Sequence, residues 1–264
     1  MPVAPELLGE VINTLNSGQF EDRLSKWLSA SVKHDNFVVI AYFQERPPKS
    51  LYSRAKESRV LANFESTYVS GAYLVDPYHA LHINKSPQGL YRLNDIAPDQ
   101  FGRNRYYREY YQSTTMVDEI AYVAYPAEGV SVHVCLGRDS TSGLRFTARE
   151  LVAADAIAPI VNAMSKRHWS DLNSTGKFDE TQIVKAVITK TEQQHQIKLS
   201  PRQAQVALMI LRGHSSVSIG LQLEISPQTV KVFRKQLYKK CRISSQAELF
   251  NLMMPVLSST LNTS

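Results

Sequence analysis

The carboxy-terminal quarter of the chain carries a closely spaced series of helix start and stop signals, which constrains the fold more than any other feature. Ser200-Pro201 and Ser226-Pro227 each place an N-cap before proline at the first helical position. Gly213 follows an apolar stripe as the expected left-handed helix end. The signals predict helices from 201 to about 212, from 215 or 216 to 223, from 227 to about 240, and from 244 or 245 onward.

The net charge of the chain is concentrated in the same region. Residues 1–198 contain equal numbers of basic and acidic residues, whereas residues 199–264 contain eight Lys and Arg against two acidic residues. The whole excess of +6 therefore lies with the predicted helices. Such asymmetry indicates a small module with a polyanionic partner beside a neutral domain with another task. The alternative interpretation is a solvated basic face.

A short helix, a tight turn and a basic helix together form a helix-turn-helix, whose second helix enters the major groove of DNA. Long donors suit this groove because guanine presents two acceptors there, while glutamine pairs with adenine. Thr229 suits a phosphate, and Val232 suits a thymine methyl group. The residues predicted to contact double-stranded operator DNA are Gln228, Thr229, Lys231, Val232, Arg234, Lys235 and Lys239. Lys240 is expected to contact phosphates.

Several runs in this module follow a known pattern. They are Leu199-Ser200-Pro201-Arg202, Gly213, the run from Ile225 to Lys231 and the run from Lys240 to Ser245. Over about sixty residues these runs resemble, with matching spacing, the LuxR-type DNA-binding domain. The resemblance implies a four-helix DNA-binding domain and a bacterial transcription factor.

The module departs from the LuxR-type pattern at a few positions. Gln203 stands for the usual Glu, Gly220 for Ala, Phe233 for His, and Cys241-Arg242 for Leu-Gly. The change at Gln203 is expected to remove an ion pair of the scaffold. The other departures are expected to alter packing or sequence preference without removing the basic face.

The neutral part of the chain predicts an α+β fold. One or two amphipathic helices are expected over 1–30, strands over 36–43, 119–125 and 130–138, and a capped helix from Thr147 to about His168. A mostly antiparallel sheet with helices packed against it is similar to GAF- or PAS-like sensory domains and to the α/β/α ligand domain of quorum-sensing LuxR proteins. A phosphorylated receiver domain is disfavoured because no acidic pair follows an early strand.

The predicted organisation has three parts. A small-ligand sensory domain is expected over 1–170, a linker with a connecting helix over 171–198, and the DNA-binding domain over 199–264. The connecting helix carries one apolar side, which is expected to pack on the sensory domain or to pair with a second copy. We expect a homodimer, because two modules on one operator match half-site symmetry.

A tyrosine-rich stretch from 68 to 119 predicts the ligand pocket, since aromatic walls with a few polar groups suit a small molecule. The predicted ligand-binding residues are Tyr68, Tyr73, Asp76, Tyr78, Tyr91, Tyr106, Tyr110 and Glu119. An amine, an amino acid or a lactone is the expected class of effector. For single tyrosines the alternative is core packing, and for Asp76 it is capping of a helix that starts at Pro77.

Acyl-homoserine-lactone receptors share one feature with this stretch, an aromatic residue upstream of Asp-Pro. Tyr68 or Tyr73 precedes Asp76-Pro77, and Tyr91 lies where those receptors often have Trp. Trp27 and Trp169 fall in predicted terminal helices instead. We therefore favour a regulator that senses another metabolite, with a lactone receptor as the alternative.

Other classes of protein find little support in the sequence. Two cysteines are too few for a disulfide framework or a zinc cluster, which favours a cytoplasmic protein. No secretory signal or membrane-length apolar run is present. We find no enzyme motif, so no catalytic residue, metal or cofactor is predicted. A ligand-independent regulator with a dimerisation domain and an enzyme fused to a DNA anchor remain alternatives.

Overall fold

The computed structural model describes residues 4–62, 64–101, 114–174 and 180–260 of the chain. The described residues form two compact units, between which the chain passes several times. The unit that we call the sheet unit comprises residues 1–62, 81–95 and 114–178. The unit that we call the helical unit comprises residues 63–80, 96–113 and 179–264. The domain boundaries predicted at 170 and 199 remain a prediction beside this division.

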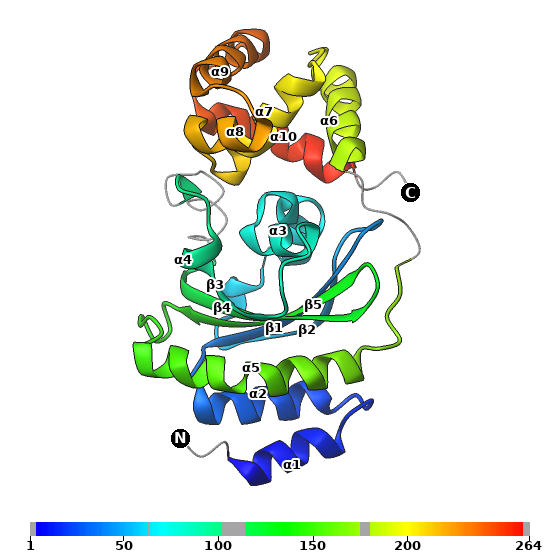
Figure 1. The fold of residues 1–264 in the computed structure, drawn as a ribbon, viewed down its shortest axis with the longest axis vertical. Coiled ribbons are helices and arrows are strands. Elements are labelled where there is room, and N and C mark those ends of the chain that lie inside the picture. Colours follow the sequence, from blue (N-terminus) through cyan, green and yellow to red (C-terminus); the bar gives the residue numbers. More distant parts are fainter. Residues whose placement is uncertain (1–3, 63, 102–113, 175–179, 261–264) are drawn as a thin grey trace. The chain divides into compact units, whose positions relative to one another are not determined.

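The sheet unit is built on one five-stranded sheet with the order β2-β1-β5-β4-β3, in which every paired strand is antiparallel. The strands are β1 (Asn36–Phe43), β2 (Lys49–Ala55), β3 (Gly89–Arg92), β4 (Met116–Ala127) and β5 (Val130–Asp139). Helices α1 (Pro5–Asn13), α2 (Phe20–Ser31) and α5 (Ala148–His168) lie on one side of this sheet (Figure 1). The mixed α+β fold expected from the sequence is confirmed.

The core of the sheet unit lies between the sheet and these helices. Side chains alternate between the two faces of a strand. On β5, Val130, Val132, Val134 and Leu136 are fully buried in the same cluster as Trp27 of α2. The opposite face of β5 carries Ser131 and His133, which are also buried. Both faces of the central strands are therefore covered within the described residues.

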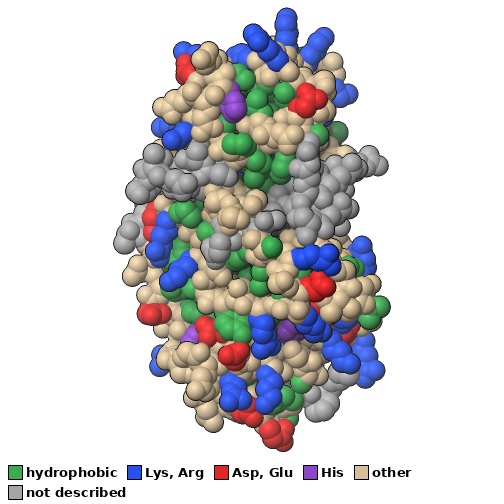
Figure 2. All heavy atoms as spheres, turned by 180° about the vertical axis from the view of Figure 1, so that it is seen from behind, with side chains coloured by type: hydrophobic (Ala, Val, Ile, Leu, Met, Phe, Trp, Pro, Cys, Tyr) green, Lys and Arg blue, Asp and Glu red, His purple; other side chains and the backbone are tan. Residues whose placement is uncertain are grey.

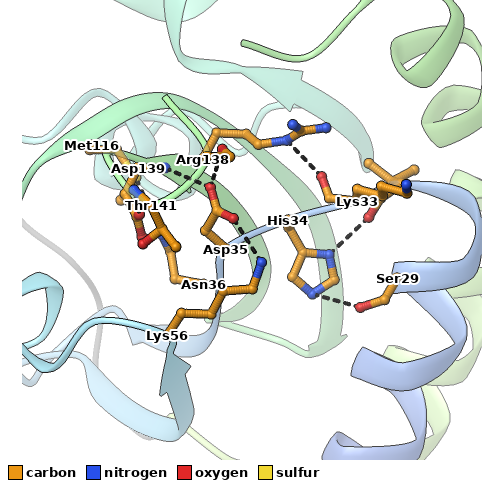
Figure 3. A network of polar contacts seen from close by, with 12 residues as sticks. Ser29, Lys33, His34, Asp35, Asn36, Lys56, Met116, Arg138, Asp139 and Thr141 are labelled. Atoms are coloured by element: carbon orange, nitrogen blue, oxygen red, sulfur yellow. Dashed lines mark hydrogen bonds and ion pairs between the residues drawn. The ribbon is translucent and has the colours of Figure 1, made fainter. Parts of the chain in front are cut away.

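A polar network fastens the start of β1 to the end of β5 (Figure 3). Asp35 accepts hydrogen bonds from the Lys56 ammonium (2.9 Å), the Asp139 backbone N–H (3.1 Å) and the Ser142 hydroxyl. Asn36 donates to the Asp139 carboxylate at 3.1 Å. Burial alone would raise the pKa of Asp35, but these donors outweigh burial and hold that pKa below its ordinary value. The buried charge is thus stabilised by donors of the same unit.

The helical unit contains five helices in its described carboxy-terminal part. They are α6 (Glu180–His195), α7 (Pro201–Arg212), α8 (Ser216–Leu223), α9 (Pro227–Cys241) and α10 (Gln246–Thr260). The remaining short elements among the described residues are η1 (Ser58–Val60), η2 (Phe64–Val69), η3 (Ala72–Val75), α3 (Pro77–Ile83) and α4 (Leu93–Ile96). Of these, η2 and η3 belong to the helical unit, and η3 packs against α7 and α10.

Helix α6 is the connecting helix that the sequence predicted. Its apolar residues Ile183, Val184 and Val187 are buried, and the helix packs against α10 and α7 of its own chain. This apolar side is therefore covered by the helical unit itself. A second copy would have to pair through another surface.

Candidate DNA-binding site and ligand-binding residues

The turn between α8 and α9 is very tight at Gly220. The Ile225 N–H donates to the Gly220 carbonyl at 2.9 Å, and Glu224 adopts the left-handed region with φ of 55°. A Cβ atom on Gly220 would lie 2.7 Å from the Ile225 carbonyl oxygen. Alanine, which is usual here in the LuxR-type pattern, would require the turn to open. Glycine at position 220 is therefore what allows the Ile225 carbonyl to lie this close to α8.

Local signals fix the start and the inner face of α9. The Ser226 hydroxyl accepts from the Thr229 N–H at 3.0 Å, as the sequence predicted for an N-cap before Pro227. Val230, Leu237 and Cys241 are buried on one side of the helix. Since these positions share one face, the opposite face of α9 points away from the scaffold.

The outer face of α9 is basic. Lys231, Lys235 and Lys239 are spaced four residues apart and are all exposed, as is Gln228. Val232 lies among them with 47% of its surface exposed. No acidic residue occurs in α9. In Figure 2, Lys and Arg side chains gather at the same end of the picture at which Figure 1 places α9.

Two of the predicted DNA-contacting residues have local partners. The Arg234 guanidinium lies over the Tyr238 ring, 5.2 Å from its centroid, and Arg234 is half-buried at the flank of the basic face. The Thr229 hydroxyl is 2.8 Å from the Ser226 hydroxyl and takes part in the N-cap. A contact of either residue with DNA remains a prediction.

Lys240 and Gln203 connect α9 to α7. The Lys240 ammonium donates to the Gln203 side-chain oxygen at 3.1 Å and to the Lys198 carbonyl at 2.8 Å. The same Gln203 oxygen accepts from the Ser200 N–H at 3.0 Å. A charge-assisted hydrogen bond thus stands where Glu would form an ion pair. Lys240 is engaged in the scaffold, which does not favour the phosphate contact expected for it.

Four of the predicted ligand-binding residues lie together in the helical unit. Tyr68, Tyr73, Asp76 and Tyr78 are all buried, and the rings of Tyr68 and Tyr73 lie 6.5 Å apart. The Tyr73 ring also meets the His79 ring edge-on at 4.8 Å. Asp76 accepts from the Tyr78 N–H at 2.8 Å with Pro77 between them, which is the geometry of a helix cap. The structure thus favours the capping interpretation of Asp76.

The other predicted ligand-binding residues are placed elsewhere. Tyr91 on β3 and Glu119 on β4 belong to the sheet unit, and both are half-buried. The Tyr91 hydroxyl donates to the Pro87 carbonyl at 2.6 Å. Tyr106 and Tyr110 lie outside the described residues. A role of these residues in binding a ligand remains a prediction.

The sheet unit also contains a cavity that the sequence analysis did not identify. It has a volume of about 280 Å³ and is lined by Gln44, His82, Lys85, Tyr125, Ala127, Glu128, Gly129 and Val130. His82, which lines the cavity, lies 2.8 Å from the Ser131 hydroxyl, and this hydroxyl lies 3.1 Å from His133. Burial lowers the pKa of His82 to about 4, so its imidazole is neutral at pH 7. The sequence signal that could have indicated this region is the presence of polar residues, Ser131 and His133, in the otherwise largely apolar strand Val130–Asp139.

The described residues contain neither a candidate metal site nor a helix that could span a membrane. No group of three or more His, Cys, Asp or Glu side chains is placed to hold a metal ion among them. No helix in this part of the chain is long and apolar enough to cross a membrane.

The capped basic helix, the tight turn before it and the supporting helices define a helix-turn-helix DNA-binding domain. Residues 198–253 match the family model described as bacterial regulatory proteins, luxR family. The chain is therefore a transcription regulator with a luxR-family DNA-binding domain. The matched model describes bacterial regulatory proteins.

Known proteins extend the likeness beyond this domain. A protein of Aeromonas salmonicida named as an HTH-type transcriptional regulator in the exeN 3' region is 29% identical over 185 residues, 68% of this chain and 93% of that protein. The crystal structure of the VqsR LBD domain from Pseudomonas aeruginosa matches 64% of this chain and 99% of its own, with 24% identity and a TM-score of 0.54. Escherichia coli SdiA covers 97% of this chain and 98% of its own, with 12% identity and a TM-score of 0.43.

Proposed function

We propose that this regulator reads operator DNA through the outer face of α9 and that a small molecule controls this binding. The observation that carries the DNA-reading part is the exposed basic face of α9, which faces away from the buried side of the helix. On this proposal Lys231 and Lys235 bind guanine acceptors in the major groove, and Gln228 binds adenine. Two copies bound to a palindrome would double the length of sequence that is read.

Variants at the basic face test the DNA-reading part. A duplex selected by the full-length chain from a random pool provides the operator, and fluorescence anisotropy measures its Kd. Lys231→Ala and Lys235→Ala are each expected to weaken operator binding by about 1–3 kcal/mol and to reduce the preference over unrelated DNA. Lys185→Ala on α6, an equally exposed lysine, is the control and is expected to change nothing. Unchanged operator preference in Lys231→Ala would contradict the assignment of α9.

The ligand-binding part of the proposal rests on two observations. Buried tyrosines cluster beside Asp76 in the helical unit, and the sheet unit holds a cavity lined by polar and apolar groups. The fold also resembles that of the VqsR LBD domain, whose name describes it as ligand-binding. A small effector of the amine, amino-acid or lactone class that prefers one arrangement of the chain would shift the population able to bind DNA.

Thermal denaturation with and without the operator tests the ligand-binding part. We expect one class among amines, amino acids and acyl-homoserine lactones to raise the melting temperature of the full chain and to change its Kd for the operator, because both effects follow from linkage. A compound that stabilises the chain without changing operator affinity would contradict ligand control. If no compound of these classes has either effect, a ligand-independent regulator with a dimerisation domain is the better account.

A further inference from the structure

The corner between α7 and α8 is held by residues from two distant segments of the chain. The Arg212 side chain at the end of α7 donates to the Leu74 carbonyl at 3.1 Å. The Gln100 N–H donates to the Gly213 carbonyl at 3.0 Å. The Ser215 N–H donates to the Asp99 carboxylate at 3.0 Å. All of these residues belong to the helical unit, and we call Leu74, Asp99 and Gln100 the corner clamp.

The first part of the corner clamp belongs to the tyrosine-rich segment. Leu74 lies in η3, between the buried Tyr73 and Val75, and η3 packs against both α7 and α10. Of the proposed ligand-binding residues, Tyr73 therefore lies on the segment that contacts the DNA-binding helices, and Tyr68 lies in η2, which packs against that segment. Because Leu74 directly follows Tyr73, a change in the packing of this tyrosine is expected to shift the position of the Leu74 carbonyl.

The second part of the corner clamp places a negative charge at the start of α8. Ser215 is the N-cap of α8, and its hydroxyl accepts from the Ser218 N–H at 3.1 Å. The Asp99 carboxylate accepts from the backbone N–H of this N-cap residue. In a capping box, a Glu at position N3 of the helix itself plays this part. Burial by itself would raise the pKa of Asp99, but the hydrogen bonds from Ser215 and the nearby His214 lower that pKa. Asp99 is thus ionised when it holds the corner.

We propose that the corner clamp opposes DNA binding and that its release is the step by which the tyrosine-rich segment controls the helix-turn-helix. In a helix-turn-helix the first helix crosses the phosphate backbone, and here that helix is α8. An exposed carboxylate fixed at its first residue repels the phosphates that approach there. The clamp also bonds the corner between α7 and α8 to η3 and to residues 99–100. The two helices therefore cannot shift relative to these segments unless the bonds break. This inference rests on the proposed function, because it supplies the route of regulation.

The test compares Asp99→Ala with Asp95→Ala in the full-length chain. Both variants remove one exposed carboxylate, but Asp95 lies in α4 within the sheet unit and is not part of the clamp. On the operator selected as above, Asp99→Ala is expected to bind about threefold to fivefold more tightly at low salt, and this gain is expected to shrink as salt is raised. Asp95→Ala is expected to bind as the unaltered chain does.

Hydrogen exchange provides a readout of the clamp that does not depend on DNA. The amide protons of Ser215 and Gln100 are expected to exchange faster in Asp99→Ala than in the unaltered chain and to stay unchanged in Asp95→Ala. If Asp99→Ala binds the operator no more tightly while Lys231→Ala loses binding, the clamp is overturned and the DNA-reading role stands. If Lys231→Ala also binds normally, the proposed function itself fails.

Discussion

The two units place their polar side chains in opposite ways. On α9 of the helical unit, Lys231, Lys235 and Lys239 face outward and have no acidic residue in their own helix. In the sheet unit, Asp35, Asp139 and their neighbours are buried and bonded to one another. The lysines that are expected to bind an external partner are thus exposed, whereas the carboxylates that stabilise the sheet unit are buried. The comparison teaches that these two charged clusters differ in burial, and that the exposed cluster is the one expected to bind a partner outside the chain.

The largest effect is expected from breaking the enclosed network. Asp35→Ala removes the acceptor of Lys56, Ser142 and the Asp139 N–H, and it leaves the last of these buried without that partner. The free energy of unfolding is expected to fall by about 3 kcal/mol, measured by urea denaturation. The Ala variant of Asp22, whose carboxylate is exposed, is the control. Equal stability of the Asp35 and Asp22 variants would contradict the contrast between the units.

The acid sensitivity of the sheet unit tests the same network by titration. The pKa of Asp35 is lower in the folded chain than in the unfolded chain, so its contribution to stability is present above the unfolded pKa and is lost as pH falls through the folded pKa. Asp35→Asn is expected to be less stable near neutral pH and to lose less stability on acidification below about pH 4. Melting temperatures of both proteins across this range provide the measurement. Parallel curves would contradict the assignment.

Two adjacent lysines of α9, Lys239 and Lys240, differ in whether the ammonium group has partners within the chain. Lys239 is exposed on the outer face, whereas the Lys240 ammonium is bonded to Lys198 and Gln203. Lys239→Ala is expected to weaken binding to all duplexes about fivefold and to lower the salt slope by about one. Lys240→Ala is expected to lower the free energy of unfolding by about 1 kcal/mol instead. Identical salt slopes for the two variants would show that the distinction is wrong.

A smaller change sharpens the same contrast at α7. Gln203→Glu places a carboxylate where the Lys240 ammonium and the Ser200 N–H already converge, near the start of the helix. The helical unit is expected to gain about 0.5 kcal/mol, because an ion pair and the helix dipole both favour the acidic side chain. Thermal denaturation measures the gain at low and high salt. A loss of stability would mean that the hydrogen bond of the amide is the better fit.

The smallest effect is expected at Asp76. Its carboxylate caps α3 through the Tyr78 N–H, and Asn is an equally good cap, so Asp76→Asn is expected to keep the melting temperature, the operator Kd and the response to an effector. Asp76→Ala is the matched variant that removes the cap and is expected to lower stability by about 1 kcal/mol. Loss of the effector response in Asp76→Asn alone would restore the ligand-binding role for this residue.

Local signals explain which parts of the fold were predictable. The starts of α7 and α9 and the Gly213 helix end depend on a few adjacent residues, and the structure confirms them. The strand 36–43 was evident because it is central and apolar. Strands β2 and β3 were not predicted, since both are edge strands that are only half-buried and carry no clear apolar pattern.

The sites depend more on contacts between distant residues. The basic face of α9 follows from helical spacing, and its lysines were predictable for that reason. The scaffold role of Lys240 depends on Gln203, which lies 37 positions away, and the contact of Asp99 with Ser215 spans 116 positions. No spacing rule in the sequence connects such residues. Burial of Tyr68 and Tyr73 likewise depends on how η2 and η3 pack.

The packing of α6 sets where the chain can be cut for biochemical work. A fragment that begins at residue 199 matches the predicted DNA-binding domain, but it leaves behind Ile183, Val184 and Val187, whose helix packs against α10 and α7. Removing them exposes apolar surface in water, which favours self-association of the fragment. A recombinant fragment that starts at residue 180 keeps this helix and is therefore expected to self-associate less than the shorter piece. DNA-binding data from the shorter piece would include this artificial association.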